Sequence, residues 1–286
     1  MRWPDWLSSR TKTTEDDQKG APKILSKTPG SWSKNLNSTD WSHYTTPQTI
    51  IASVITTATT LALIRLYKTY LRRIPTVEYL KPSLFRQRSL FGYVTSVGDG
   101  DNFRLFHTPG GRWLGWGWLP GRKIQNKTPK EVKDQTVHVR IAGVDAPELA
   151  HFGRPSQPYG QEALDWLKSN IAGRYVRAYP YRRDQYDRIV CSVYQRKFVF
   201  FKSDVGLNML KSGLATVYEA KFGSEFGNQE ENYRDAEAKA KQKGVGMWQA
   251  PGLVDKMLGS SGSKKQPESP RAYKTRMTKQ EQEGKK

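Results

Sequence analysis

From Tyr44 to Ile64 the chain carries no formally charged side chain, and the central residues of this segment are aliphatic or small. A helix that crosses a bilayer needs about 20 predominantly apolar residues. It also tolerates threonine, because the hydroxyl can hydrogen-bond back to a helix carbonyl. The segment therefore predicts a single transmembrane helix over residues 47–66.

The residues after this segment support the same prediction. Tyr67, Tyr70, Lys68, Arg72 and Arg73 fit the aromatic and basic belt of a membrane interface. A buried helix of a soluble protein is the alternative. However, Thr and Ala occupy all faces of the segment instead of one stripe, and the polar flanking sequence offers no core. The positive-inside rule would place the C-terminal bulk of the chain on the positive-inside face.

Both ends of the chain are polar. Residues 1–46 are rich in Ser, Thr, Lys and Pro, and residues 251–286 are rich in Ser, Gly, Lys and Gln, so both are expected to be disordered. Residues 67–89 read as a basic connector marked by Pro75 and Pro82. The formal net charge of +20 and the pI near 9.9 favour an anionic partner, either nucleic acid or an anionic membrane face.

A compact domain is expected over residues 90–250, and its most informative stretch is VHVRIAGVDAPE, residues 137–148. Alternating Val and Ile predict a short, half-buried strand with Arg140 pointing away from the apolar row. A glycine and a proline then break the strand, and Asp145 and Glu148 follow. Carboxylates suit a hard cation and proton transfer, and a guanidinium suits a phosphate, so the stretch suggests metal-assisted chemistry on a phosphoester. Taken alone, the stretch is better explained as a strand followed by a polar turn.

Two segments ahead of this stretch add to the pattern. FGYVTSV and FRLF read as strands joined by the tight turn GDGDN, in which Asp99 and Asp101 flank a glycine. Residues 107–135 are an insertion rich in Gly, Pro, Lys and Trp. Its aromatic and basic side chains could stack on single-stranded bases, pack on the barrel or sit at a membrane surface. They are Trp113, Trp116, Trp118, Arg112, Arg122 and Lys123.

The rest of the domain alternates helices and strands. Helices are expected over about 161–172, after an N-cap at Ser203 or Asp204, and over about 231–243. Strands YVRAYPY and RIVCSVYQ bracket the polar turn RRDQYDR. The single cysteine lies in the second of these strands, and it excludes an intramolecular disulfide framework or a cysteine zinc cluster.

The ordered motifs are a DGD turn, RIAGVDAPE, a PYGQEALDWL helix, a DQYDR turn, GLNMLKSGLATVY and GVGMWQ. In this order the chain closely resembles the staphylococcal nuclease, or thermonuclease-like, family from Leu90 to Trp248, apart from the insertion. The resemblance implies an α+β fold: an OB-type five-stranded β-barrel with about three helices, here preceded by one transmembrane helix. The anchor narrows it towards the fungal membrane-anchored mitochondrial endonucleases, which implies a single-pass membrane protein of the mitochondrion.

The resemblance also assigns roles at matching positions. It implies a Ca²⁺ site made by the carboxylates of Asp101 and Asp145 and the backbone carbonyl of Ala146. Oxygen ligands with several retained waters suit Ca²⁺ better than Mg²⁺. Glu148 matches the proposed general base that activates the attacking water, and Asp99 an acid that supports the turn.

Arg140 and Arg188 match the two phosphate-binding arginines of the family. Tyr186 and, across an alignment gap, Tyr218 match tyrosines that lie on the nucleotide. Asn102 and Ala146 replace threonines usual in the family, so the hydrogen bonds that those hydroxyls make around the metal ligands are expected to be missing.

The implied activity is hydrolysis of phosphodiester bonds in DNA and RNA by a membrane-anchored, Ca²⁺-dependent endonuclease with little sequence preference. No obligate protein partner is implied. One alternative is a catalytically inactive OB module that binds nucleic acid or protein, and another is a membrane tether whose barrel only scaffolds partners. Neither needs two metal carboxylates, a general base and two arginines together, so the complete set favours the enzyme.

Overall fold

A computed structural model of the chain divides into two compact units, Met1–Ala62 and Leu63–Lys286. The segment 1–46, expected to be disordered, lies almost wholly outside the residues that the structure describes. Those residues are 38, 40, 42–125, 127–150, 154–196, 201–219, 223–249 and 268–283.

The apolar segment forms the long helix α2 (Pro47–Leu66), which follows the 3-10 turn η2 (Ser42–Thr45) and continues into the π-helical turn η3 (Tyr67–Leu71). None of the α2 side chains is buried. Thr56 donates its hydroxyl to the carbonyl of Ala52 at 2.8 Å, which is the back-bonding that lets an apolar helix carry threonine. Within the described part of the chain, α2 with η3 is one helix that is long and apolar enough to cross a membrane.

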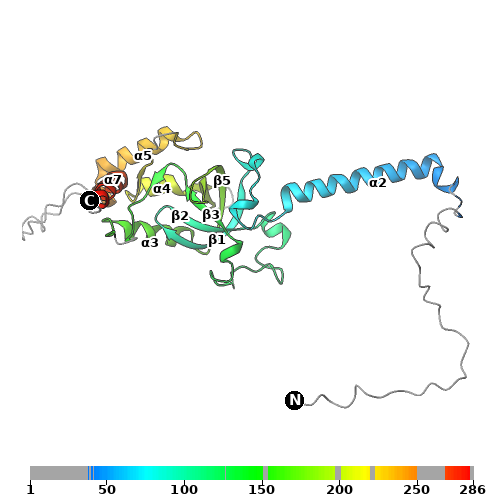
Figure 1. Ribbon diagram of the computed structural model, residues 1–286, viewed down its shortest axis with the longest axis horizontal. Coiled ribbons are helices and arrows are strands. Elements are labelled where there is room, and N and C mark those ends of the chain that lie inside the picture. The colour runs from blue at the N-terminus through cyan, green and yellow to red at the C-terminus, as the bar shows by residue number, and fades with distance from the viewer. Residues whose placement is uncertain are drawn as a thin grey trace, which may run out of the picture. The chain divides into compact units, whose positions relative to one another are not determined.

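The second unit is built on a closed barrel of five strands (Figure 1). Strand β3 pairs antiparallel with β2 and parallel with β6, and this second pairing closes the barrel. Short β7 (Lys202–Asp204) extends the sheet at β6, and β4 (Val144–Asp145) pairs with β8 (Thr216–Val217). The predicted OB-type fold is therefore confirmed. The barrel strands are β1 (Leu90–Asp99), β2 (Asn102–His107), β3 (Val137–Ile141), β5 (Tyr175–Arg183) and β6 (Ile189–Arg196).

The barrel interior follows from the two-residue period of its strands. Val137, Val139 and Ile141 are fully or almost fully buried, whereas His138 and Arg140, which alternate with them, are only partly buried. Cys191 on β6 is a buried free thiol, as expected for a strand residue in the core, and burial raises its pKa. Burial of these apolar side chains is the main force that holds the barrel closed.

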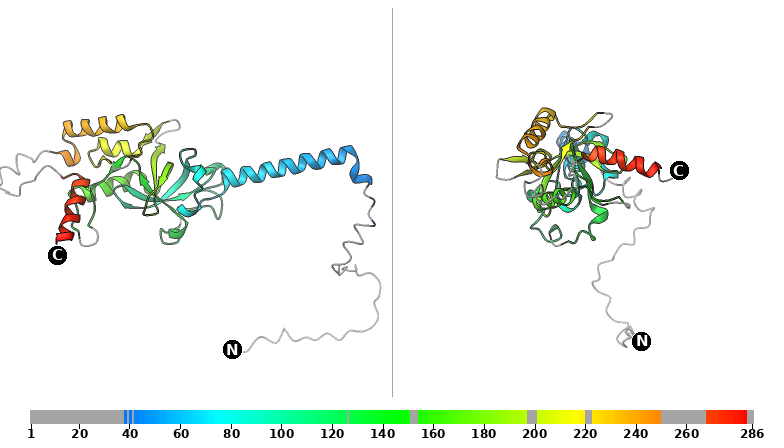
Figure 2. Two further views of the ribbon diagram at one scale, coloured as in Figure 1. Left: turned by 45° about the horizontal axis from the view of Figure 1, so that its top comes forward. Right: turned by 90° about the vertical axis from the view of Figure 1, so that its left-hand side faces the viewer.

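Helices α3 (Gly160–Ile171), α4 (Val205–Lys211) and α5 (Glu230–Lys243) accompany the barrel, and the short turn η8 (Gly246–Trp248) follows α5. Helices α4 and α5 lie side by side (Figures 1 and 2). Asp204 caps α4 by accepting from the amide of Leu207 at 3.0 Å and also accepts from the Tyr233 hydroxyl at 2.9 Å. One carboxylate thus joins the two helices, and Asp204 is the N-cap of the two residues considered.

The expected connector 67–89 is partly core. Val77, Leu80 and Leu84, from the short turns η4 (Val77–Tyr79) and η5 (Pro82–Leu84), are buried in the main hydrophobic cluster. The two turns are separated by extended residues, Leu80 and Lys81, so no single helical period marks these side chains in the sequence, and their burial depends on packing against the barrel.

The expected tail also differs in part from the prediction. Residues 268–283 are described, and Pro270–Glu283 form the helix α7. The remainder of 251–286 lies outside the described residues. The helix forms here because Ser269 accepts from the amide of Ala272 at 3.2 Å, as an N-cap does, and Pro270 occupies the first helical position.

The Trp-rich insertion is a folded lobe with two 3-10 turns, η6 (Gly111–Leu114) and η7 (Lys133–Gln135). Trp116 packs edge-on against Phe106 of β2, with ring centroids 5.9 Å apart, and its Nε1 donates to a backbone carbonyl. Trp113 is 97% exposed. Three roles were considered for these aromatic side chains. Trp116 has one of them, packing on the barrel, whereas Trp113 lies on the exposed surface of the lobe.

Candidate active site

Strand register brings the first acid to the first arginine. Asn102 of β2 pairs with Arg140 of β3, so the residue before it, Asp101, lies at the same end of the strand pair. The amide of Ile141 donates to the carbonyl of Asp101 at 2.9 Å, and Arg140 Nη2 lies 3.1 Å from Asp101 Oδ2.

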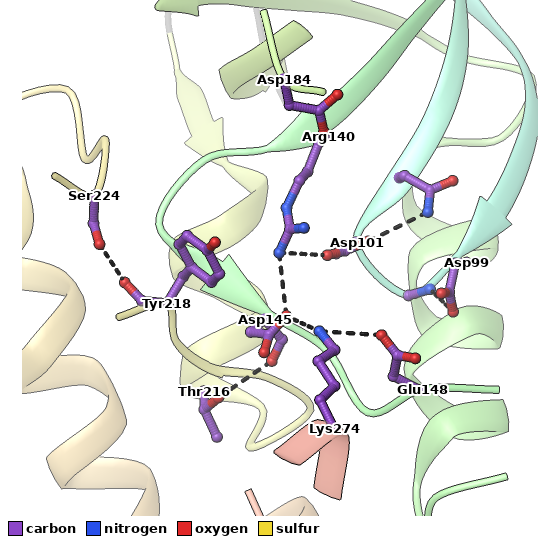
Figure 3. A network of polar contacts seen from close by, with 12 residues as sticks. Asp99, Asp101, Arg140, Asp145, Glu148, Asp184, Thr216, Tyr218, Ser224 and Lys274 are labelled. Carbon is purple, nitrogen blue, oxygen red and sulfur yellow. Dashed lines mark hydrogen bonds and ion pairs between the residues drawn. The ribbon is translucent and has the colours of Figure 1, made fainter. Parts of the chain in front are cut away.

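The second acid, Asp145, lies in the segment after β3. Asp145 of β4 pairs with Thr216 of β8, and its Oδ1 lies 3.1 Å from the same Arg140 Nη2 (Figure 3). The DGD turn packs directly on this segment, because a Cβ added to Gly100 would lie only 2.7 Å from the Cβ of Ala146. A glycine in the turn and a small residue beside Asp145 thus let the two acids converge, and both acids are buried.

Glu148 lies at the open side of this pair, with a side chain that is 31% exposed. Its amide donates to Gln157 Oε1 at 2.8 Å, which fixes the backbone of the loop. Lys274 of α7 joins the cluster: its Nζ lies 2.9 Å from Asp145 Oδ1 and 3.1 Å from Glu148 Oε1 (Figure 3).

The electrostatics of the cluster reflect crowded carboxylates. Burial raises the pKa of Asp145, and Lys274 and Arg140 act against that rise. Burial and then the charge of Asp101 raise the pKa of Asp99. Burial alone would lower the pKa of Arg140, but Asp101 and Asp145 raise it overall. Burial therefore opposes ionisation of Asp99 and Asp145, and neighbouring cations offset part of this effect at Asp145.

This donor set suits a hard cation. Within the described residues no three His, Cys, Asp or Glu side chains form a ready-made metal cage, so a cation would rest on Asp101 and Asp145 with backbone and water oxygens completing its shell. The cations that Asp145 already holds, the Arg140 guanidinium and the Lys274 ammonium, show that this carboxylate takes positive charge. Asn102 donates to Asp101 Oδ1 at 3.3 Å, so here a contact to the ligand is present despite the missing threonine.

Arg188 occupies a neighbouring position on the barrel. The parallel pairing of Val139 with Ile189 sets it beside β3, and Asp184 holds it there through bonds to its Nε at 2.7 Å and its amide at 2.9 Å. Its guanidinium lies 5.1 Å from the ring centroid of Tyr186, which is 66% exposed. Burial works to raise the pKa of Asp184, but the bonds from Arg188 lower it overall.

Tyr218 reaches the centre of the cluster from the chain after β8. Its amide donates to the carbonyl of Gly143 at 3.0 Å, and its ring lies beneath the Arg140 guanidinium at 4.7 Å. Asp99 supports the turn by accepting from the amide of Gly100 at 2.7 Å. The structure thus gathers Asp101, Arg140, Asp145, Ala146, Glu148 and Tyr218 at one place, with Arg188 and Tyr186 on the adjoining turn.

Two residues of the site are absent from the sequence-based set. Asp184 lies inside the quoted DQYDR motif, and its spacing of four residues from Arg188 is a signal that could have found it. Lys274 has no such signal, because it lies 129 residues from Asp145 in a segment without a strong apolar period.

Comparisons with known proteins agree with this geometry. Residues 138–250 match the family model described as staphylococcal nuclease homologue. The chain is 54% identical to "Probable endonuclease lcl3" of Botryotinia fuckeliana (strain B05.10) over 96% of this chain and 97% of that protein. It is 50% identical to "Probable endonuclease LCL3" of Arthroderma otae (strain ATCC MYA-4605 / CBS 113480) over 97% and 96%. The chain therefore belongs to the staphylococcal nuclease family, together with these fungal proteins.

Proposed function

We propose that this protein is a membrane-anchored endonuclease that hydrolyses phosphodiester bonds of DNA and RNA with the help of Ca²⁺. The family and the names of its relatives support a nuclease, which is a hydrolase. The finer parts of the proposal are the metal, the anchor, the residue roles and a mitochondrial location. The last of these rests on resemblance alone.

One observation carries the proposal. Asp101 and Asp145 come from segments 44 residues apart, since 145 − 101 = 44, yet both meet one nitrogen of Arg140 at 3.1 Å. Glu148 adjoins them through Lys274. Buried acids are costly unless they are paired, and a domain that only binds nucleic acid has no need to gather them.

The roles follow from charge and exposure. Glu148, the most exposed of the three acids, accepts a proton from the attacking water. Arg140 and Arg188 offer planar forks of donors to the non-bridging phosphate oxygens, and this preorganised charge counts most as negative charge builds in the transition state. Tyr218 and Tyr186 present flat faces beside these arginines, where a base or sugar would lie.

Asp101, Asp145 and the carbonyl of Ala146 would hold the cation. A bound Ca²⁺ would polarise a phosphate oxygen and offset charge on the reacting group. The protein's own part is to keep two buried carboxylates at one place, beside the more exposed Glu148.

Cleavage of a labelled single-stranded DNA by the full chain in detergent micelles tests the proposal. We expect activity with Ca²⁺ and its loss on chelation with EGTA. We also expect Glu148→Gln, Arg140→Gly and Arg188→Gly each to lower kcat by about 100-fold or more, because each removes a contact that acts in the transition state. Glu231→Gln, an exposed acid on α5, is the matched control and should cleave like the unmodified chain. Lack of cleavage with any divalent ion would instead favour the inactive OB module.

A further inference from the structure

A side chain from a distant part of the same protein, Lys274, already occupies the candidate site. Lys274 of α7 inserts its ammonium between Asp145 Oδ1 and Glu148 Oε1, at 2.9 and 3.1 Å, and its side chain is only 35% exposed (Figure 3). These two carboxylates are the ones assigned to the metal and to the water under the proposed function. The ammonium therefore occupies lone pairs that both roles require.

The first turns of the helix pack on the loop that carries Glu148. Tyr273 is 4% exposed and donates its hydroxyl to the carbonyl of Pro155. Gln157 donates to the carbonyl of Glu268 at 3.4 Å while its Oε1 holds the amide of Glu148. Gln157 thus connects the start of α7 to the loop of the base.

A further contact fixes the outer side of the helix. Arg271 Nη1 lies 3.2 Å from Glu219 Oε2, on the segment that follows Tyr218. Neighbouring residues of α7 therefore contact both sides of the acid cluster, which makes the position of Lys274 a property of the docked helix rather than of one flexible side chain.

We propose that α7 is an autoinhibitory segment that occupies the candidate site, and that Ca²⁺ and the substrate strand act by displacing it. This inference rests on the proposed function. The ammonium and a divalent cation compete for Asp145, because Oδ1 already accepts both Arg140 and Lys274, and a further cation beside them would add repulsion between like charges. An incoming phosphate would in turn meet a helix that covers the base. The state with α7 docked and the active state thus exclude each other. Ca²⁺ and the substrate strand each favour the state in which α7 is undocked.

Two measurements on the full chain in detergent micelles test this. Hydrogen–deuterium exchange of residues 270–283 should increase when Ca²⁺ is added, because the displaced helix loses its protection. Calorimetric titration with Ca²⁺ should show about fivefold tighter binding to Lys274→Gln, since one competing charge is removed. A chain ending at residue 268, which lacks α7, should bind Ca²⁺ at least as tightly.

Lys279→Gln is the matched control, since Lys279 lies on the same helix with a side chain that is 77% exposed. It should leave both the exchange and the Ca²⁺ affinity unchanged. If the chain binds Ca²⁺ but exchange of α7 and the affinity of Lys274→Gln stay as in the unmodified protein, the inference is wrong and the proposed nuclease stands. If Ca²⁺ releases α7 but no variant cleaves DNA, the proposed function fails instead. Absence of Ca²⁺ binding to all forms would overturn both.

Discussion

His107 ends β2 with its imidazole buried, and its Nδ1 accepts from the amide of Ile74 at 3.0 Å. Burial, with smaller effects from Arg73 and Arg88, lowers its pKa from 6.5 to about 4. The folded protein therefore keeps this residue neutral while the unfolded chain takes up a proton below pH 6.5. The free energy of unfolding should fall as the pH drops from 6.5 to 4, with a slope of up to about 1.4 kcal/mol per pH unit.

Denaturant unfolding followed by circular dichroism across this pH range measures the effect. His107→Asn removes the titrating group but keeps an acceptor for Ile74, so its stability should depend less steeply on pH in the same window. An identical slope in both proteins would show that the pH dependence of stability comes from groups other than His107. His138, whose pKa burial also lowers to about 4, provides the background slope in both.

At the scale of single residues, the sequence predicts a site residue when the other site residues that it contacts are close to it in the chain. Arg140, Asp145 and Glu148 belong to one continuous stretch, and the strand pairing next to it adds Asp101. Asn102 differs from the expectation because its amide, not a threonine hydroxyl, contacts Asp101. Lys274 could not be found, because its contact depends on how a distant helix docks.

At the scale of single elements, the packing of the insertion after β2 depends on one of its tryptophans. Trp116 belongs to a small cluster with Phe106, Ile124 and Val132, whereas Trp113 contacts solvent. Trp116→Ala should therefore lower the free energy of unfolding by about 2–3 kcal/mol, through lost burial and a lost ring contact.

Trp113→Ala is the paired control for this experiment, because an exposed side chain away from packed features changes stability by less than about 0.5 kcal/mol. Urea unfolding monitored by circular dichroism compares the two variants. Equal losses of stability in both would contradict the assignment of Trp116 as the packed residue.

Elements with their own start and stop signals were predicted well. Helix α4 begins after its Asp204 cap, and α5 ends at Gly244, whose φ of 61° suits glycine. Helix α7 was missed because composition dominated the interpretation of residues 251–286. Its Ser-Pro start is a local signal, but its stabilising contacts come from distant segments such as the loop that contains Pro155.

At the scale of the whole molecule, the proposed location of the protein depends on α2. Every side chain of this helix is outside a core, so the proposed anchor predicts that the full chain stays with membranes after carbonate extraction. The double variant Ile55→Arg/Leu61→Arg should appear in the supernatant, because each arginine costs about 2.5–3.5 kcal/mol at the centre of a membrane helix.

Thr56→Ser keeps the segment uncharged and should pellet like the unmodified chain. Release of the unmodified chain by carbonate would argue against a membrane span and for a helix that packs on a partner.

The barrel as a whole was predicted through resemblance of its ordered motifs, not through the contacts that close it. The parallel pairing of β3 with β6 joins Arg140 to Val190, 50 positions further on, since 190 − 140 = 50. Local periodicity predicts that both strands exist, but it carries no information about which strands pair.

Strand β2 has one end at the candidate site and the other beside Ile74. Asn102 pairs with Arg140 at the first end, and His107 receives the amide of Ile74 at the second. Its six residues separate the two ends by roughly 17–20 Å at about 3.3 Å per residue. The titrating imidazole and the candidate site therefore lie at opposite ends of a single strand. The pH dependence of stability that His107 causes should for that reason be separable from any pH dependence that arises at the acid cluster.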